Sequence, residues 1–145
     1  MSSRTIFLGA DHAGFKLKER LKPWLLGLGY AVGDASPTFK EGDDYPMHGK
    51  KVAQLVAKHK DSVGILFCGS GVGISIAANR QKGARAFDAY DVKTTKLARE
   101  HNDANIIALS GWHVSAAKAK QLITLFLKTP FSKAERHHRR VRQLG

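Results

Sequence analysis

The fold class is indicated most clearly by one stretch of sequence, Val63-Gly64-Ile65-Leu66-Phe67 followed by Cys68-Gly69-Ser70-Gly71-Val72-Gly73. Its first part is apolar throughout, which is typical of a strand covered on both faces of a parallel sheet. The glycines that follow allow a sharp turn, and a short helix is predicted from about residue 74 to residue 79. The stretch therefore predicts a strand, turn and helix of an α/β protein.

The same alternation continues outward in both directions along the chain. Strands are predicted over residues 5–8, 30–32, 63–67, 84–87 and 105–109. Helices are predicted over about 15–28, from 46 onward, and over 74–79, 92–100 and 115–127, with Pro23 kinking or restarting the first of them. Strands that alternate with helices indicate a parallel sheet of about five strands between two helix layers, with right-handed crossovers.

Size and composition indicate one domain, residues 1–145, which includes a basic C-terminal segment over 133–145. The chain has 145 residues, of which 43% are hydrophobic, enough to form one core. No apolar run approaches the ~18 residues of a membrane span, and no signal-peptide core is recognisable, so a cytoplasmic protein is expected. A single cysteine, Cys68, excludes an internal disulfide framework and a cysteine-rich zinc cluster.

The charge balance favours partners that carry phosphate. Lysine and arginine number 24 against 12 aspartate and glutamate residues, a net charge of +12. Such a charge attracts small phosphorylated metabolites and nucleic acids alike, and composition does not choose between them.

Polar residues follow three of the predicted elements at positions suited to a site. The first strand leads into Asp11-His12-Ala13-Gly14, the apolar strand into Cys68 and the glycine loop, and the helix before the last strand closes with His101-Asn102-Asp103. Ligands of parallel sheets bind beyond the carboxyl ends of the strands. We therefore expect Asp11, His12, Cys68 and His101 to lie at one edge of the sheet.

The glycine loop, Gly69 to Gly73, is suited to an anion. Its backbone can approach a ligand closely and point amide N–H groups at phosphate or oxyanion oxygens. It is not the dinucleotide fingerprint, because Ile74 stands where a third glycine is required, and it lacks the Walker lysine. The alternative is a tight turn that binds nothing.

Cys68 is the candidate general base. A thiol beside loop amides and a helix N-terminus is expected to have a pKa below its usual ~8.5, so that a thiolate is available to accept protons. The alternative is an inert buried thiol. His12 and His101 can exchange protons near neutral pH.

Other polar residues have plainer interpretations. His48, His59 and His113 are expected to be surface or hydrogen-bonded structural residues. Asp11 either orients a hydroxyl or a histidine, or caps the helix that follows.

The basic C-terminal segment places Arg136 and Arg140 four residues apart, on one face if the segment is helical. Two guanidinium groups so placed suit a phosphate. The alternative is a solvated tail or a non-specific contact to nucleic acid.

Taken in order, these motifs resemble the ribose-5-phosphate isomerase B family, which also includes galactose-6-phosphate and allose-6-phosphate isomerases. The matching segments are Asp11-His12-Ala13-Gly14, Asp44-Tyr45-Pro46, Cys68 to Gly73 with Ser75-Ile76-Ala77-Ala78-Asn79, His101-Asn102-Asp103-Ala104-Asn105, and Arg136-His137 with Arg139-Arg140. The resemblance implies a Rossmann-like three-layer α/β/α sandwich that forms a homodimer or homotetramer with active sites shared between subunits. It also implies aldose–ketose isomerisation without a metal or other cofactor.

The resemblance further implies a role for each matching residue. Cys68 corresponds to the base that moves a proton between C2 and C1, and His101 to the group that opens the furanose ring. The enediolate oxygen is stabilised by the Ser70 hydroxyl and by the backbone amides of the loop, which include Gly69, Gly71, Val72 and Gly73. The substrate's hydroxyls and phosphate are held by five further residues: Asp11, Asn102, His12, Arg136 and Arg140.

Two departures from the family pattern bear on substrate choice. Ser70 replaces a threonine common among relatives and keeps the hydroxyl, whereas Trp112 replaces an arginine that in many members contacts phosphate. The leading substrate is ribose 5-phosphate, and the alternative is a six-carbon sugar phosphate such as allose 6-phosphate or galactose 6-phosphate. A basic protein that reuses the fold to bind nucleic acid is a more distant alternative, and no membrane partner is expected.

Overall fold

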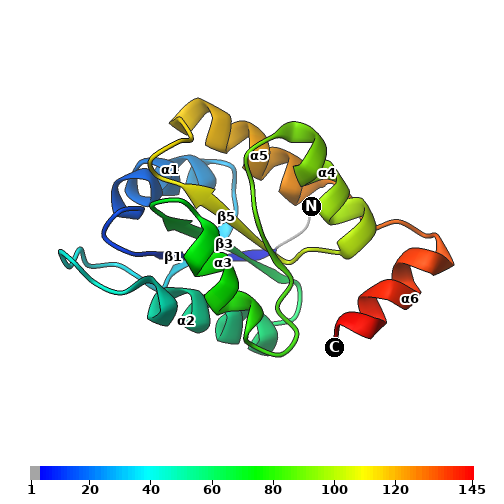
Figure 1. Cartoon of the computed structure of the whole chain (residues 1–145). Coiled ribbons are helices and arrows are strands. Elements are labelled where there is room, and N and C mark those ends of the chain that lie inside the picture. Colours follow the sequence, from blue (N-terminus) through cyan, green and yellow to red (C-terminus); the bar gives the residue numbers. More distant parts are fainter. Residues whose placement is uncertain (1–3) are drawn as a thin grey trace.

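The computed structural model describes residues 4–145, which form one five-stranded sheet with helices on both faces (Figure 1). All strand pairs are parallel, and the strand order is β2-β1-β3-β5-β4. The strands are β1 (Thr5–Ala10), β2 (Ala31–Asp34), β3 (Ser62–Cys68), β4 (Ala86–Asp88) and β5 (Ile106–Ser110). The central register aligns Leu8 with Ile65 and Ile65 with Ile107.

Two helix layers enclose the sheet. The helices are α1 (Phe15–Gly27), α2 (Tyr45–Lys58), α3 (Val72–Asn79), α4 (Val92–Asn102), α5 (Ala116–Lys128) and α6 (Glu135–Leu144). Apolar residues of α1, α4 and α5 pack in one core cluster, and those of α2 and α3 pack in a second cluster. The predicted three-layer sandwich with about five parallel strands is therefore confirmed.

The central strand β3 is buried along its whole length because it contributes to both clusters. Ile65 and Phe67 face the α1, α4 and α5 layer, whereas Leu66 and Cys68 face the α2 and α3 layer. This alternation follows from the two-residue period of a strand. It brings the Cys68 side chain onto the same face as α3, the helix that starts just after the glycine loop.

The structure refines the predicted boundaries and resolves two open points. Pro23 lies inside α1 without ending it, so the helix is neither broken nor restarted there.

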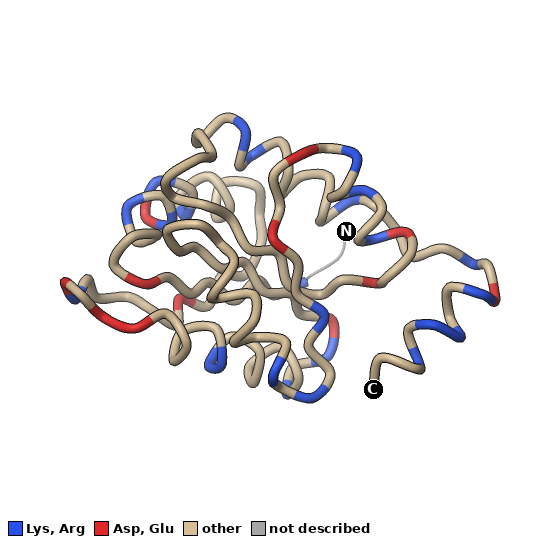
Figure 2. The backbone as a smooth tube through the Cα atoms, viewed as in Figure 1, with Lys and Arg blue, Asp and Glu red and all other residues tan. Residues whose placement is uncertain are grey.

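The basic C-terminal segment forms α6, which packs beside α4 and extends away from the sandwich (Figure 1). Figure 2 shows lysine and arginine spread over the outer helices and gathered along α6. Over residues 4–145 no helix has the length and apolar character needed to cross a bilayer.

Candidate active site

A cavity of about 490 Å³ opens at the carboxyl ends of β1 and β3. Its lining comes from the turn after β1, the start of α2, the glycine loop with α3, and the loop after β5. The lining residues are Asp11, His12, Ala13, Tyr45, Cys68, Gly69, Ser70, Val72, Gly73, Ile76 and Trp112. Asp11, His12, Cys68 and most of the glycine loop are thus brought together at one edge of the sheet, as the sequence predicts.

Asp11 both caps a turn and lines the cavity. Its Oδ1 accepts a hydrogen bond of 3.0 Å from the Gly14 amide, and its side chain is buried. The turn sits close to β3, since a Cβ added to Gly14 would lie 2.2 Å from the carbonyl carbon of Phe67. Only glycine allows this approach, which holds the Asp11 carboxylate beside the end of β3.

His12 is oriented by Asp43, a residue of the long loop between β2 and α2. The Asp43 Oδ1 accepts from the His12 amide at 2.7 Å, and the His12 Nδ1 donates to the Asp43 carbonyl at 3.2 Å and lies 3.3 Å from Oδ1. Burial lowers the His12 pKa, but the hydrogen bonds to Asp43 and the charges of Asp11 and Asp43 outweigh it, so the pKa is raised above its ordinary value. A raised pKa favours the imidazolium form, which can donate to a phosphate.

A buried polar network fixes Asp43 in turn. The His48 Nε2 donates to Asp43 Oδ2 at 2.7 Å, and the Ser36 hydroxyl lies 2.6 Å from His48 Nδ1. The Ala10 amide donates to the Ser36 hydroxyl at 3.1 Å. The network therefore ties the long loop to the end of β1, where the cavity begins.

Lys18 anchors the other end of this network. Its side chain is fully buried, and its Nζ donates to the Ser36 carbonyl at 2.8 Å and to Asp34 Oδ2 at 2.7 Å. A buried ammonium requires such partners, because an unpaired charge would be strongly destabilising. Sequence reasoning missed the roles of Asp43 and Lys18, and the only signal was the length of the polar segment that forms the loop over residues 35–44. His48 is confirmed as a hydrogen-bonded structural histidine.

Cys68 ends β3 with only 4% of its surface exposed, and its Sγ accepts the Gly71 amide at 3.1 Å. Burial is the largest influence on its pKa and raises it. The amides of Ile74 and Gly71 lower the pKa, while the charges of Asp11 and Asp88 raise it further. The net pKa lies above the usual value, so the expectation of a lowered pKa was wrong for the chain by itself: desolvation and two carboxylates outweigh the loop amides.

The glycine loop is held tightly between its neighbours. Gly71 has a left-handed backbone with φ of 88°, a conformation that glycine adopts readily, and it caps the start of α3. The Ser70 hydroxyl accepts the Val72 amide at 3.2 Å, and the Tyr90 hydroxyl donates to the Ser70 carbonyl. The Trp112 amide donates to the Gly69 carbonyl at 3.2 Å. Hydrogen bonds from two directions thus fix the loop against the cavity.

Trp112 forms part of the cavity wall. Its indole ring packs over Gly69, where an added Cβ would lie 2.5 Å from the ring, and 69% of the residue remains exposed. An apolar aromatic surface therefore stands beside the polar groups Asp11 and His12.

His101 and Asn102 lie elsewhere, and the expectation that His101 shares an edge with Cys68 was wrong within one chain. The helix α4 follows β4 and runs back toward the amino ends of the strands, so its last turn reaches the opposite edge of the sheet. Asn102 shares a pocket with Arg85 and Ala104, which precede β4 and β5. His101 shares another with Phe131 and His137, and neither pocket includes a residue that lines the Cys68 cavity.

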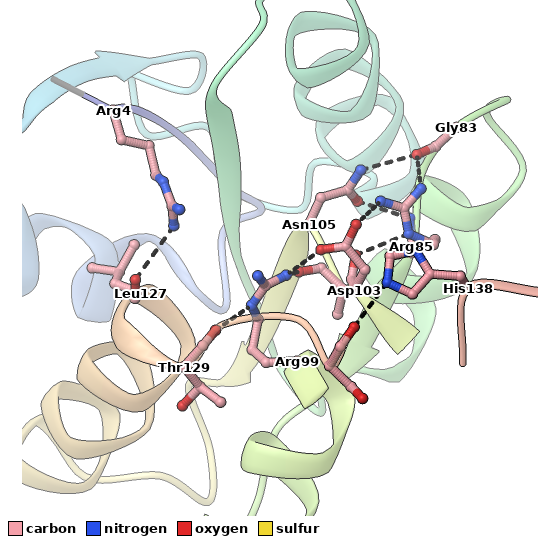
Figure 3. Close-up of polar contacts among 11 residues, drawn as sticks. Arg4, Gly83, Arg85, Arg99, Asp103, Asn105, Leu127, Thr129 and His138 are labelled. Atoms are coloured by element: carbon pink, nitrogen blue, oxygen red, sulfur yellow. Dashed lines mark hydrogen bonds and ion pairs between the residues drawn. The ribbon is translucent and has the colours of Figure 1, made fainter. Parts of the chain in front are cut away.

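A polar network fixes this end of α4 (Figure 3). Asp103 has a left-handed backbone with φ of 47°, and its carboxylate accepts from Arg99 Nη1 at 2.9 Å and from Arg85 Nη2 at 3.3 Å. Arg99 also donates to the Thr129 carbonyl at 3.0 Å, which joins α4 to the segment leading into α6. The orientation of His101 and Asn102 therefore depends on a rigid helix end.

The basic residues of α6 lie beside His101. The rings of His101 and His137 pack at a tilt of 32° with centroids 4.2 Å apart, and Arg136 and Arg140 are exposed one helical turn apart. Burial lowers the His137 pKa most, and the neighbouring basic groups of His101, Arg136 and Arg140 lower it further. The candidate residues thus form two groups, one in the Cys68 cavity and one around the α4 and α6 ends.

The first group can carry out proton transfer next to an anion. Cys68 supplies a sulfur base, the loop supplies amides and Asp11 supplies a carboxylate for hydroxyl groups. Among residues 4–145, no three histidine, cysteine, aspartate or glutamate side chains gather as they would around a metal ion.

Comparison with known proteins gives close matches over nearly the whole chain. The family model described as Ribose/Galactose Isomerase matches residues 6–144. The ribose-5-phosphate isomerase B of Mycobacterium tuberculosis (strain CDC 1551 / Oshkosh) is 41% identical over 142 residues, which cover 97% of this chain and 88% of that protein.

Solved structures agree with the sequence matches. A ribose 5-phosphate isomerase from Thermotoga maritima superposes with a TM-score of 0.92 at 41% identity, covering 99% of this chain and 98% of that one. The Mycoplasma genitalium ribose-5-phosphate isomerase B, solved with bound ribulose-5-phosphate, gives 0.93 at 37% identity and covers 99% and 95% of the two chains.

Proposed function

The chain belongs to the ribose/galactose isomerase family, and from this premise we propose that it interconverts ribose 5-phosphate and ribulose 5-phosphate with Cys68 as the base. The resemblance seen in the motifs is thereby confirmed. The observation that carries the proposal is the cavity that joins Cys68, the glycine loop, Asp11 and His12 at the carboxyl edge of the sheet. Relatives that match over nearly the whole chain are named for this reaction.

The proposed reaction begins with binding and ring opening. His12 donates to the phosphate, and its raised pKa supports the charged form that this role needs. Asp11 and Asn102 hold sugar hydroxyls, and His101 transfers the proton that opens the furanose ring. The open-chain aldehyde then lies with its C2 next to the Cys68 sulfur.

Isomerisation is a proton transfer between neighbouring carbons. The Cys68 thiolate takes the proton from C2, and the electron pair of the C–H bond moves toward the C1 carbonyl to give an enediolate with its charge on O1. The loop amides from Gly69 to Gly73 and the Ser70 hydroxyl stabilise that charge. A proton passes from O2 to O1, and Cys68 returns its proton to C1, which leaves the carbonyl at C2.

The proposal includes a homodimer, or a tetramer built from it, because the second group of residues lies away from Cys68. His101, Asn102, Arg136 and Arg140 are all exposed, so they are accessible to the cavity of another copy. The rim of the cavity supports this arrangement. Val72 and Ile76 on α3 are 50% and 53% exposed, as expected for apolar side chains that another subunit covers.

Turnover is the first test. The purified protein, incubated with ribose 5-phosphate without added metal, is expected to form ribulose 5-phosphate, and Cys68→Ala is expected to lower kcat by ~10²–10⁴ with an unchanged circular dichroism spectrum. Retention of most activity by the variant would remove Cys68 from its role. Faster turnover of allose 6-phosphate or galactose 6-phosphate would make a six-carbon sugar the substrate, and Trp112 in the cavity wall makes this comparison necessary.

Failure on all three sugars would redirect the proposal. Salt-sensitive binding to duplex DNA without isomerase activity would then favour the nucleic-acid alternative.

Since sugar phosphates are charged and do not cross bilayers freely, the proposal places the reaction in the cytoplasm.

Sharing of the site is tested by complementation. Cys68→Ala and His101→Asn are each expected to be inactive alone, whereas their co-expression restores about a quarter of the wild-type sites in a two-fold dimer, because each mixed dimer contains one intact site. Co-expression of two differently tagged copies of Cys68→Ala is the matched control and stays inactive. No recovery in the mixed sample would place His101 and Cys68 in separate functions or in one chain's site.

A further inference from the structure

A half-buried carboxyl at the end of β4 has no place in the proposed reaction. The Asp88 Oδ1 is buried and accepts no hydrogen bond from any residue between 4 and 145. Buried carboxylate oxygens are normally paired, because an unpaired one is costly to desolvate. Such an atom calls for an explanation.

Asp88 lies directly against the glycine loop. A Cβ added to Gly71 would be 2.1 Å from Asp88 Oδ1 and 3.3 Å from Oδ2, so the carboxyl fills the space that a side chain at residue 71 would take. The amide of the same glycine donates to the Cys68 sulfur at 3.1 Å. Gly71 is therefore close both to the Asp88 carboxyl and to the sulfur of the proposed base.

Few other ionisable groups act at this point. Of the elements packed on β4, α3 and β5 carry no ionisable side chain within Val72–Asn79 or Ile106–Ser110, and α5, whose Phe126 packs against Phe87, carries only lysines among its ionisable residues. Asp91, the next acid along the chain, accepts from the Thr94 amide and caps α4. Asp11 is the second carboxylate whose charge acts on Cys68, from the end of β1.

We propose that Asp88 is a positioning residue of the catalytic loop, whose carboxylate opposes negative charge on the Cys68 sulfur across Gly71. Two observations on ionisation agree with this geometry. Burial raises the pKa of Asp88 to about 6, so the group is largely ionised at neutral pH. Its charge contributes to the raised pKa of Cys68. Asp88 thus makes the thiolate scarcer and more strongly basic.

Alkylation of the protein by iodoacetamide tests the inference without any substrate. Cys68 is the single cysteine, so the rate reports on this sulfur alone. Asp88→Asn is expected to raise the rate roughly three- to tenfold at about pH 7.5, because the amide removes the opposing charge, and to raise it by a smaller factor as the pH increases and the thiolate fraction of both proteins grows. A merely structural role would raise the rate by the same factor at every pH.

The matched control is Asp61→Asn, which removes the same charge from an exposed residue at the opposite end of β3. Asp61 has a left-handed backbone with φ of 60°, a conformation that asparagine tolerates. No rate change is expected in this control. An equal rate in wild type and Asp88→Asn at neutral pH, or an equal increase in the control, would overturn the inference. Asp88→Ser serves as a second variant if the amide disturbs folding.

The effect on catalysis, which rests on the proposed function, is a shift of the acid limb of the kcat/KM profile to lower pH in Asp88→Asn. Alkylation and turnover separate the two proposals. A protein without isomerase activity whose alkylation changes as expected retains the inference and loses the function. An active enzyme with unchanged alkylation retains the function and loses the inference.

Discussion

Burial disfavours the ionised form of the Asp88 carboxyl, and this affects the stability of the folded protein as well as the reactivity of Cys68. In the unfolded chain the carboxyl has its ordinary pKa of 3.8, whereas in the folded chain its pKa is about 6. Between these two pKa values the folded chain keeps the proton on Asp88, whereas the unfolded chain has released it. The free energy of unfolding therefore falls as the pH rises from 4 to 6.

Asp88→Asn is accordingly expected to stabilise the protein above about pH 6 by about 1 kcal/mol, a figure reduced for solvent screening because the residue is only partly buried. The corresponding rise in Tm is about 2–4 °C at pH 7.5 and near zero at pH 4. Thermal unfolding followed by circular dichroism at both pH values measures it. An equal Tm change at both pH values would assign the effect to packing instead of charge.

His12 depends on Asp43 for its charge at neutral pH. Asp43→Asn removes a carboxylate that bonds the His12 amide and ring, so the His12 pKa falls. We expect KM for ribose 5-phosphate to rise roughly threefold to tenfold at about pH 7.5 and less at about pH 6, with a smaller change in kcat. Asp44→Asn, which changes the exposed neighbouring residue, is the control. NMR titration of the His12 ring checks the cause directly, and an unchanged pKa would contradict it.

At the scale of elements, the strand and helix pattern was predictable because local periodicity encodes it. The apolar β3 and the glycine loop specify a buried strand and a sharp turn, and the structure confirms both. The gathering of Asp11, His12 and Cys68 followed from one rule about the carboxyl ends of parallel strands. These parts of the site depend on short stretches of sequence.

The failures have a common origin in contacts between distant segments. His101 follows a helix that returns to the opposite edge, so its position depends on chain direction and not on its own motif. The pKa of Cys68 depends on burial and on Asp88, which is 20 residues away in sequence. The missed roles of Asp43 and Lys18 likewise arise only when the loop after β2 folds against α1 and α2.

The exposed face of α3 gives a prediction about assembly. Ile76→Glu places a charge on an apolar side chain at the cavity rim, which a subunit interface would have to desolvate. We expect the variant to sediment as a monomer and to lose at least about tenfold in kcat, with an unchanged circular dichroism spectrum.

The control for this variant is Leu26→Glu on α1. Leu26 is 51% exposed, much as Ile76 is at 53%, but it lies in the other helix layer. Sedimentation velocity and turnover are expected to match the wild type. A fully active monomeric Ile76→Glu protein would show that one chain completes the site alone.

At the scale of the whole molecule, the net charge of +12 acts on the approach of substrate. The lysine and arginine residues along the outer helices and α6 (Figure 2) attract a phosphate dianion before it reaches the cavity. Raising NaCl from about 20 to 200 mM is expected to lower kcat/KM roughly threefold while kcat changes little, because salt screens long-range attraction more than contacts inside the cavity. Sucrose at equal osmolality is the control, and a parallel fall in kcat would point to an effect on the bound state.

The chain of buried polar contacts from Lys18 through Ser36 and His48 to Asp43 has a consequence for how this sequence can vary. The side chains of Ser36, His48 and Asp43 bond one another, so replacing one leaves its neighbour with an unmet hydrogen bond, whereas Lys18 joins them through the Ser36 backbone carbonyl. Paired substitutions within the set should therefore be far from additive, and a harmful change at His48 should be relieved by a second change at Ser36 or Asp43. These residues are therefore expected to change together during evolution, because the order in which mutations arise determines which combinations remain stable.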